Sequence, residues 1–280
     1  MSLLSRRSFF KTAAALGTLP LTLNASDAPT DTLKLIHITD SHMDLGDSDS
    51  VDAMKLMVTF INTHYKDLDL VLFGGDNFNN NSAADSDALA FKKIVDKLHC
   101  PYYSVRGNKE SSPKGDAQID GERFYELFVK DRGLVESGND WKLEKNGIQI
   151  LGLDSCIDHQ NNGRYTPSTL RFAKKALQTN KPTLMLNHHP YTNYWKGSDP
   201  KDIHKYVLNN TQEVQKQLFS YKNLLVTLSG HKHIDSVTTI QGTKVIVTRG
   251  FVRPIDLDNY PMRYLEISPN SVEEKLIYTS

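Results

Sequence analysis

Five apolar segments of this chain each end at a short run of side chains that can bind metal ions. The segments read as buried strands at 33–39, 68–74, 101–107, 183–188 and 224–230. The runs at their ends are Asp40-Ser41-His42, Gly74-Gly75-Asp76-Asn77, Gly107-Asn108-Lys109-Glu110, Asn187-His188-His189-Pro190 and Gly230-His231-Lys232-His233. Open α/β sheets bind ligands at the carboxyl ends of their strands. The pattern therefore predicts a single metal or phosphate site at a shared sheet edge.

The spacing of apolar residues predicts an α/β fold. Helical patterns at about 51–65 and at 83–98 separate the first three strands, which favours parallel strands joined by right-handed crossovers. The second half reads mostly as hairpins, with Asn146-Gly147 as the strongest turn signal. We therefore expect one domain over residues 29–280, with two mixed β-sheets packed face to face and flanked by helices.

Composition excludes several classes of protein. The 33 Lys+Arg balance the 33 Asp+Glu, and this formal net charge of zero gives no reason to expect a nucleic-acid partner. No apolar run reaches the roughly 18 residues of a transmembrane segment, so none is predicted. Cys100 and Cys156 do not form a Cys-x-x-Cys pair, which excludes a thiolate zinc knuckle. Whether the two cysteines pair with each other stays open.

Residues 1–28 resemble a twin-arginine signal peptide. Arg6-Arg7 precede Ser-Phe-Phe-Lys and a mildly apolar run at 12–23 that Pro20 interrupts. We therefore expect the twin-arginine export machinery to recognise this segment, and the mature protein to be periplasmic or otherwise exported. Ala25 and Ala28 are alternative cleavage positions.

The strand-end residues are carboxylates, imidazoles and amides without a thiolate, a donor set that suits Mn, Fe, Co or Zn. Over about residues 33–250 their order resembles the pattern D-x-H, G-D-x-x-[DN], G-N-H-[DE], H-x-P and G-H-x-H of the calcineurin-like metallophosphoesterase superfamily. The resemblance implies a four-layer α/β/β/α sandwich and two metal ions. It implies these ligands: Asp40, His42 and His233 for one ion, Asn108, His188 and His231 for the other, and Asp76 bridging both.

The same resemblance implies a hydrolase of small phosphorylated substrates. In the family, a hydroxide that bridges the two ions attacks phosphorus, while the ions stabilise the charge on the phosphate oxygens. We expect phosphodiester or phosphoanhydride bonds to be hydrolysed. Two alternatives stay open here, an extracytoplasmic phosphomonoesterase and a catalytically weak metal-binding scaffold.

Lys109 departs from the family pattern, which has histidine at this position. Its ammonium group can stabilise phosphate charge, but an ordinary pKa of about 10.4 makes it a poor general acid. We therefore predict catalytic roles for Asn108 and Lys109 and a preference for leaving groups that need little protonation. In the alternative interpretation, Lys109 points into solvent.

Asn79 is the second departure, since purple acid phosphatases carry a metal-binding tyrosine there. The segment 151–177 is more similar to the bacterial cyclic-nucleotide phosphodiesterase branch of the superfamily. Within it, Gly163, Arg164 and Tyr165 either contact substrate or form a plain surface loop.

The residues after His188 also leave alternatives open. His189 either meets the substrate or supports a ligand histidine. The aromatic residues Tyr191, Tyr194 and Trp195 form either a stacking wall for a base or ordinary loop packing.

Overall fold

The computed structural model describes residues 32–192, 207–253 and 259–279. The chain divides into two units, residues 1–30 and residues 31–280, and the fold below is that of the second. The predicted signal peptide lies outside the described residues. Within the described ranges, no helix has both the length and the apolar character needed to cross a membrane.

The first sheet has the strand order β12-β11-β1-β2-β3. Its strands are β1 Leu33–Ile38, β2 Leu70–Phe73, β3 Tyr102–Ser104, β11 Pro261–Ser268 and β12 Ser271–Tyr278. Strands β1, β2 and β3 are parallel, whereas β11 is antiparallel to both β1 and β12. The carboxyl ends of the three parallel strands therefore meet at one edge.

The second sheet has the order β4-β5-β6-β7-β8-β10-β9. Its strands are β4 Val135–Ser137, β5 Asp140–Lys145, β6 Ile148–Gly152, β7 Thr183–Leu186, β8 Leu224–Ser229, β9 Ser236–Ile240 and β10 Thr243–Val247. The central strands β6, β7, β8 and β10 are parallel, and the outer strands are antiparallel to their neighbours. Both sheets are thus mixed, as the sequence predicts.

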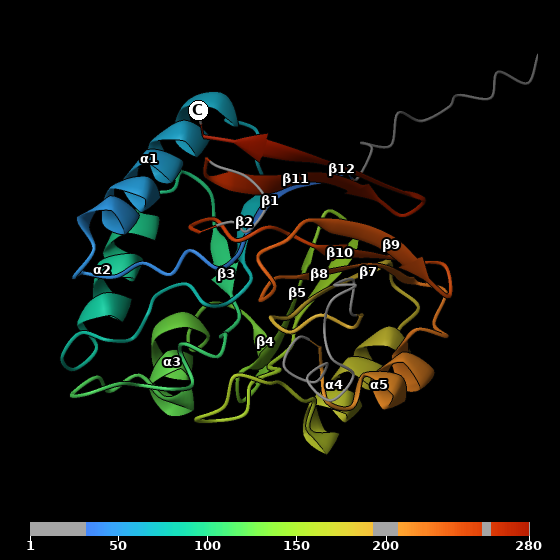
Figure 1. Ribbon diagram of the computed structural model, residues 1–280. Coiled ribbons are helices and arrows are strands. Elements are labelled where there is room, and N and C mark those ends of the chain that lie inside the picture. The colour runs from blue at the N-terminus through green and yellow to red at the C-terminus, as the bar shows by residue number, and fades with distance from the viewer. Residues whose placement is uncertain (1–31, 193–206, 254–258, 280) are drawn as a thin grey trace, which may run out of the picture. The chain divides into compact units, whose positions relative to one another are not determined.

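The described helices are α1 Ser48–His64, α2 Ser86–Val95, α3 Gly121–Phe128, α4 Pro167–Leu177 and α5 Thr211–Leu218. In Figure 1, α1 and α2 lie beside the first sheet, and α4 and α5 lie beside the second. Helix α4 begins with Pro167 in its first turn, and its N-cap Thr166 accepts from the backbone N–H of Thr169.

Alternation along the strands builds two apolar layers on the second sheet. Ile150 and Leu184 belong to the core shared with β1, β2, α1 and α2. Their neighbours Leu151 and Met185 pack with α4 and α5. Because successive strand residues point to opposite faces, the layers follow one another as helices, sheet, sheet, helices. This confirms the predicted α/β sandwich.

The structure confirms one predicted turn and differs from the sequence prediction at two helices. Asn146 and Gly147 join β5 to β6 with φ values of 48° and 72°, the left-handed pair of a type I′ hairpin. Helix α2 begins at Ser86, three residues after the predicted start. Helix α3 has no counterpart among the predicted helices, because Phe124 and Phe128 are its only buried residues and give too short a pattern.

Trp141 on β5 joins the two sheets. Its indole is fully buried, and Nε1 donates a hydrogen bond of 2.9 Å to the backbone oxygen of Ser104 on β3. Gly152 is its partner across the ladder, and a Cβ atom there would overlap the indole ring. The ring therefore fills a space that only glycine at position 152 leaves open.

We predict that Trp141→Phe lowers the free energy of unfolding by about 1–3 kcal/mol, because it leaves the buried Ser104 carbonyl without a donor. Urea denaturation followed by circular dichroism measures the change. The control Val135→Ala, at a side chain that is 58% exposed on β4, should change stability by less than about 0.5 kcal/mol. Equal effects of the two substitutions would contradict the role given to Trp141.

Candidate metal centre

All seven predicted metal ligands lie just beyond the carboxyl ends of strands. Asp40 and His42 follow β1, Asp76 follows β2, Asn108 follows β3, His188 follows β7, and His231 and His233 follow β8. Five of them have positive φ angles: Asp40, His42, Asp76, His231 and His233. This left-handed conformation is unfavourable for residues other than glycine and is concentrated at functional sites. The loops are therefore held in shapes that local preference alone would not give.

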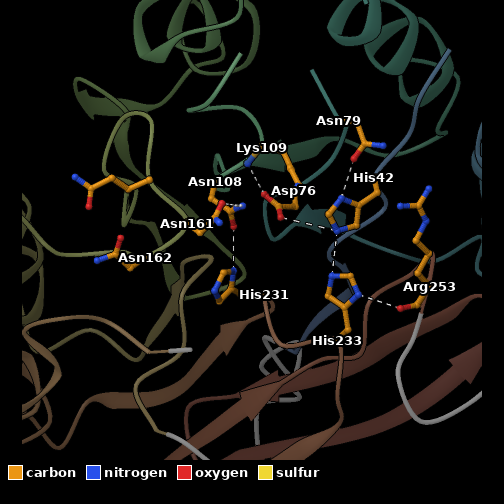
Figure 2. A pocket seen from close by; sticks show the side chains of 11 residues that line it. His42, Asp76, Asn79, Asn108, Lys109, Asn161, Asn162, His231, His233 and Arg253 are labelled. Carbon is orange, nitrogen blue, oxygen red and sulfur yellow. Dashed lines mark hydrogen bonds and ion pairs between the residues drawn. The ribbon is translucent and has the colours of Figure 1, made fainter. Parts of the chain in front are cut away.

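One group of donors consists of Asp40, His42 and His233. The Nε2 atom of His233 lies 3.2 Å from Asp40 Oδ1 and 3.0 Å from His42 Nε2. Asp40 is fully buried, and its Oδ1 atom accepts no hydrogen bond from a described residue. Two imidazole nitrogens and a buried carboxylate oxygen thus converge on one point, shown at the right of Figure 2 for the two histidines.

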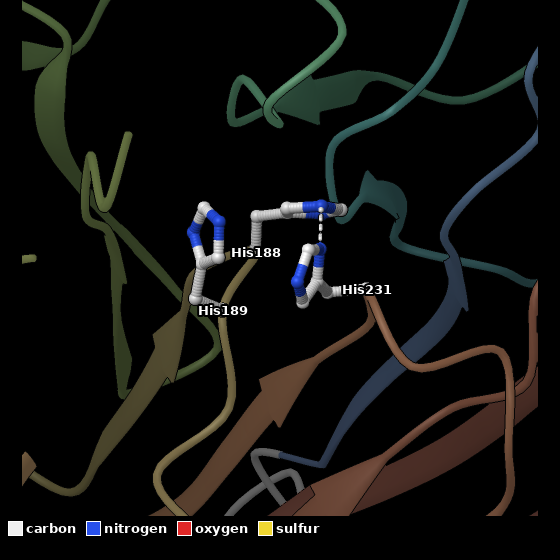
Figure 3. A group of neighbouring side chains, drawn as sticks. All are labelled: His188, His189 and His231. Carbon is white, nitrogen blue, oxygen red and sulfur yellow. Dashed lines mark hydrogen bonds between the residues drawn. The ribbon is translucent and has the colours of Figure 1, made fainter. Parts of the chain in front are cut away.

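A second group consists of Asn108, His188 and His231. Asn108 Oδ1 lies 3.1 Å from His188 Nε2 and 3.0 Å from His231 Nδ1. The two imidazole nitrogens are 3.2 Å apart, and Figure 3 shows the two rings nearly perpendicular, with these nitrogens directed at each other. Three potential ligand atoms therefore form a compact triangle.

Asp76 lies between the two groups. Its Oδ1 atom is 3.5 Å from His188 Nε2, and its Oδ2 atom is 3.8 Å from His42 Nε2. One oxygen thus faces each group, which is the arrangement that a bridging carboxylate requires.

The residues present fit divalent or transition-metal ions. The donors are carboxylate and amide oxygens with imidazole nitrogens, and the Asp40 oxygen that accepts no hydrogen bond lies 3.2 Å from His233 Nε2 and 3.9 Å from His42 Nε2. The proximity of His42 and His233 nitrogens, both of which accept when unprotonated, also calls for a cation between them.

Backbone and side-chain acceptors orient three of the histidines. The Nδ1 atom of His188 is 2.9 Å from the Gly74 carbonyl, and that of His233 is 2.9 Å from the Arg253 carbonyl. A carbonyl only accepts, so Nδ1 carries the proton in both rings. The Nε2 atoms are then left to face the centre, as in metal-binding histidines.

Asn79 orients the third histidine. Its Oδ1 atom accepts from His42 Nδ1 at 3.1 Å, and its Nδ2 group donates to Asp44 Oδ2 at 3.0 Å. Asp44 thus fixes the amide, and the amide fixes the ring of His42. Asn79 occupies the position that holds a tyrosine in purple acid phosphatases, and in this chain it orients His42.

Charge balance between the groups shifts their pKa values. Burial opposes ionisation, yet Asp76 raises the pKa of His188 to about 9, and Asp40 raises the pKa of His233 to about 9. In return, His233 and His188 hold the pKa values of Asp40 and Asp76 well below their usual range despite burial. A bound cation would therefore replace protons at the two imidazoles.

Glu110 holds the loops after β2 and β3 together, a role that the sequence did not reveal. Its carboxylate is fully buried. It accepts from the backbone N–H groups of Asp76 at 3.0 Å, Asn77 at 2.5 Å, Phe78 at 3.3 Å and Gly107 at 2.6 Å. The acidic residue at the end of the run Gly107-Asn108-Lys109-Glu110 is the signal for this role in the sequence.

Five of the seven candidates line a pocket of about 680 Å³, and Asp40 and His188 are not among its lining residues. Its other lining residues are Asn79, Lys109, Gln160, Asn161, Asn162 and Arg253. Lys109 is among these lining residues, and its backbone N–H donates to Asp76 Oδ1 at 2.7 Å (Figure 2).

The loop within segment 151–177 lines the pocket with other residues than the three that the sequence analysis names. Gly163, Arg164 and Tyr165 do not line this pocket, whereas Gln160–Asn162 of the same loop do. Tyr165 is buried, and its hydroxyl lies 2.6 Å from that of Tyr191. Loop residues show no periodicity, so the sequence located the loop without identifying its inward side chains.

His189 contacts the candidate ligand histidines, whereas Tyr191 belongs to the apolar core. His189 lies beside the rings of His188 and His231 (Figure 3), with Nδ1 2.8 Å from Ser155 Oγ and Nε2 3.2 Å from the Asn161 carbonyl. Tyr191 is fully buried in the core with α4 and α5, which supports ordinary packing. Tyr194 and Trp195 lie outside the described residues.

Cys100 and Cys156 are both free and buried.

Comparison with known proteins identifies what this arrangement resembles. The sequence model of the family described as calcineurin-like phosphoesterase matches residues 33–235. A probable cyclic nucleotide phosphodiesterase of Fibrobacter succinogenes is 27% identical over 232 residues, which cover 80% of this chain and 82% of the relative. One of Psychrobacter arcticus is 24% identical over 190 residues, 64% of this chain and 62% of the relative.

Solved structures share the fold at low sequence identity. A dimetal phosphatase from Danio rerio aligns with a TM-score of 0.62 and 14% identity, covering 89% of this chain and 99% of its own. The yellow lupin purple acid phosphatase PPD1 aligns with a TM-score of 0.59 and 13% identity, covering 89% of this chain and 52% of its own. These likenesses confirm the α/β sandwich.

We predict that Glu110→Gln lowers both stability and metal affinity, because it places an amide N–H₂ among backbone N–H donors. Loss of charge-assisted hydrogen bonds should lower the free energy of unfolding by about 3 kcal/mol. Urea denaturation and titration calorimetry with Mn²⁺ measure the two effects. The control Glu273→Gln, at an exposed residue of β12, should leave both unchanged. A Glu110→Gln protein with normal Mn²⁺ affinity would contradict the role given to Glu110, which is to hold the loops after β2 and β3 together at the metal centre.

Proposed function

The chain belongs to the calcineurin-like phosphoesterase family, and we propose that it hydrolyses phosphodiester or phosphoanhydride bonds with the help of two metal ions. The observation that carries this proposal is the convergence of seven side chains into two adjacent groups, with one oxygen of Asp76 directed at each. As a metallophosphoesterase, the protein is a hydrolase.

The two groups define the proposed ligands. Asp40, His42 and His233 would hold one ion, Asn108, His188 and His231 the other, and Asp76 both. Mn, Fe, Zn and Co suit this donor set, and the residues alone do not select among them. When bound, two such ions make a water molecule acidic near neutral pH and neutralise charge on the phosphate oxygens.

The chain's own residues bind and orient the phosphate. The Asn108 amide presents Oδ1 to the two histidines, so its Nδ2 group is directed away from them toward the pocket, where it meets Asn161 Oδ1 at 3.4 Å. That N–H₂ group can donate to a phosphate oxygen. Lys109 adds a positive charge on the same side. Both stabilise the extra negative charge of the transition state.

Cyclic nucleotides are the first diesters to consider. Both curated relatives carry the name of probable cyclic nucleotide phosphodiesterases. A pocket of about 680 Å³ is within the usual range for sites that bind a small organic molecule. The twin-arginine-type segment 1–28 supports the further proposal that the enzyme is exported to the periplasm.

The direct test is turnover by Mn²⁺-loaded protein of bis(p-nitrophenyl) phosphate, 3′,5′-cyclic AMP and p-nitrophenyl phosphate. We predict that the diesters are hydrolysed faster than the monoester and that a chelator abolishes activity. Asp76→Asn should lower kcat at least about a hundredfold, and the exposed control Asp52→Asn on α1 should not. A metal-loaded wild type without turnover on any phosphate would favour the scaffold; a preference for the monoester would favour a phosphomonoesterase.

Lys109 generates a separate prediction. With a lysine in place of a histidine acid, the rate should fall steeply as the leaving group becomes more basic. We expect Lys109→His to make this dependence shallower across a series of aryl methyl phosphates. Lys114→His, on the exposed part of the same loop, is the matched control. Identical slopes for wild type and Lys109→His would exclude an influence of Lys109 on leaving-group protonation.

A further inference from the structure

The pocket has two chemically different sides. Gln160, Asn161 and Asn162 lie on the side of Asn108 and His231, and Arg253 lies on the side of His42 and His233, as Figure 2 shows for the labelled residues. The amide side has hydrogen-bonding groups without charge. The opposite side has a guanidinium group, which favours anions.

The amide side is built on a rigid support. The buried side chain of Arg106 donates from Nε to Asp154 at 2.9 Å and from Nη1 to Asp158 at 2.7 Å. The backbone N–H of His159 donates to the Ser111 carbonyl at 2.8 Å. These bonds tie the loop to the segment that carries Asn108, so its amides are positioned before a ligand arrives.

A second set of contacts fixes the other end of the loop. The Asn161 carbonyl accepts from His189 Nε2 at 3.2 Å. A Cβ atom at Gly163 would overlap the His189 ring, so backbone and ring are in close contact. The backbone N–H of Asn209 donates to the Gly163 carbonyl at 2.8 Å. The loop is therefore anchored on both sides of Asn161 and Asn162.

Side-chain amides on this loop have hydrogen-bonding capacity to spare. Asn161 accepts a hydrogen bond from Asn108 Nδ2 with its Oδ1 atom. The Nδ2 group of Asn161 is therefore available to donate to a ligand. Asn162 is half-buried and lines the pocket, and its side chain has no hydrogen bond to another described residue. Asn161 thus offers donors, and Asn162 offers donors and an acceptor in one plane, the pattern that matches the edge of a base such as adenine.

From this geometry we infer that Asn161 and Asn162 bind the nucleoside part of a nucleotide substrate and determine specificity for it. The inference rests on the proposed function, because the phosphate must lie over Asp76 and Asn108 for the nucleoside to reach the amides. The uncharged amides do not attract a further phosphate group, so a substrate with one phosphate and one nucleoside fits this side best.

Asn162→Ala is the appropriate variant, since Asn161 also contacts Asn108. The quantity to measure is the ratio of kcat/KM for 3′,5′-cyclic AMP to that for bis(p-nitrophenyl) phosphate. Loss of one hydrogen bond should lower this ratio about fivefold to tenfold. The control Arg164→Ala, on the same loop but outside the pocket, should leave the ratio at the wild-type value.

Calorimetric titration of the Mn²⁺-loaded proteins with 5′-AMP gives a readout that does not depend on turnover. Asn162→Ala should weaken binding by a similar factor, with the thermal midpoint of unfolding unchanged. An unchanged ratio and AMP affinity in Asn162→Ala, equal losses in Arg164→Ala, or no AMP binding by wild type would each overturn the inference. Absence of turnover on every phosphate would instead refute the proposed function, and the AMP titration would still decide whether Asn162 binds a nucleotide.

Discussion

The Glu110 carboxylate accepts hydrogen bonds from the backbone N–H groups of two loops, at Asp76 and at Gly107, which are more than thirty residues apart in the sequence. Parallel strands determine only where each loop begins, and the carboxylate determines how Asp76 and Asn108 face each other. Asp76 has a φ of 50°, a conformation that costs a non-glycine residue about 1–3 kcal/mol. Hydrogen bonds from its N–H and from that of Asn77 to Glu110 offset this cost. The geometry of the whole centre depends on that buried contact.

Beyond the Glu110 contact, three of the candidate ligands are histidines with an orienting partner of their own. Carbonyls of Gly74 and Arg253 hold His188 and His233, while the Asn79 amide holds His42. Such contacts restrict the rings before any ligand binds, which is the condition for strong electrostatic stabilisation of a transition state. The loop with Asn161 extends the same principle from the metal centre to the organic part of the substrate.

The sequence predicted the layers, and it predicted which side chains lie together at the strand ends, because both depend on local patterns. Apolar alternation gives the strands, and parallel strands bring Asp40, Asp76 and Asn108 to one edge whatever the details of packing. The roles of Glu110 and Asn79 arise from contacts between segments distant in sequence, which no spacing rule expresses. The sequence did not predict that Asn162 lines the pocket, because the orientation of its side chain depends on how Arg106 anchors an irregular loop.

In the proposed centre, two ions share the Asp76 carboxylate. Anomalous diffraction at the manganese edge from crystals of the Mn²⁺-loaded protein tests it most directly. We expect two peaks about 3.5–4 Å apart. One should lie beside Asp40, His42 and His233 and the other beside Asn108, His188 and His231, with Asp76 contacting both. A single peak, or peaks away from these residues, would contradict it.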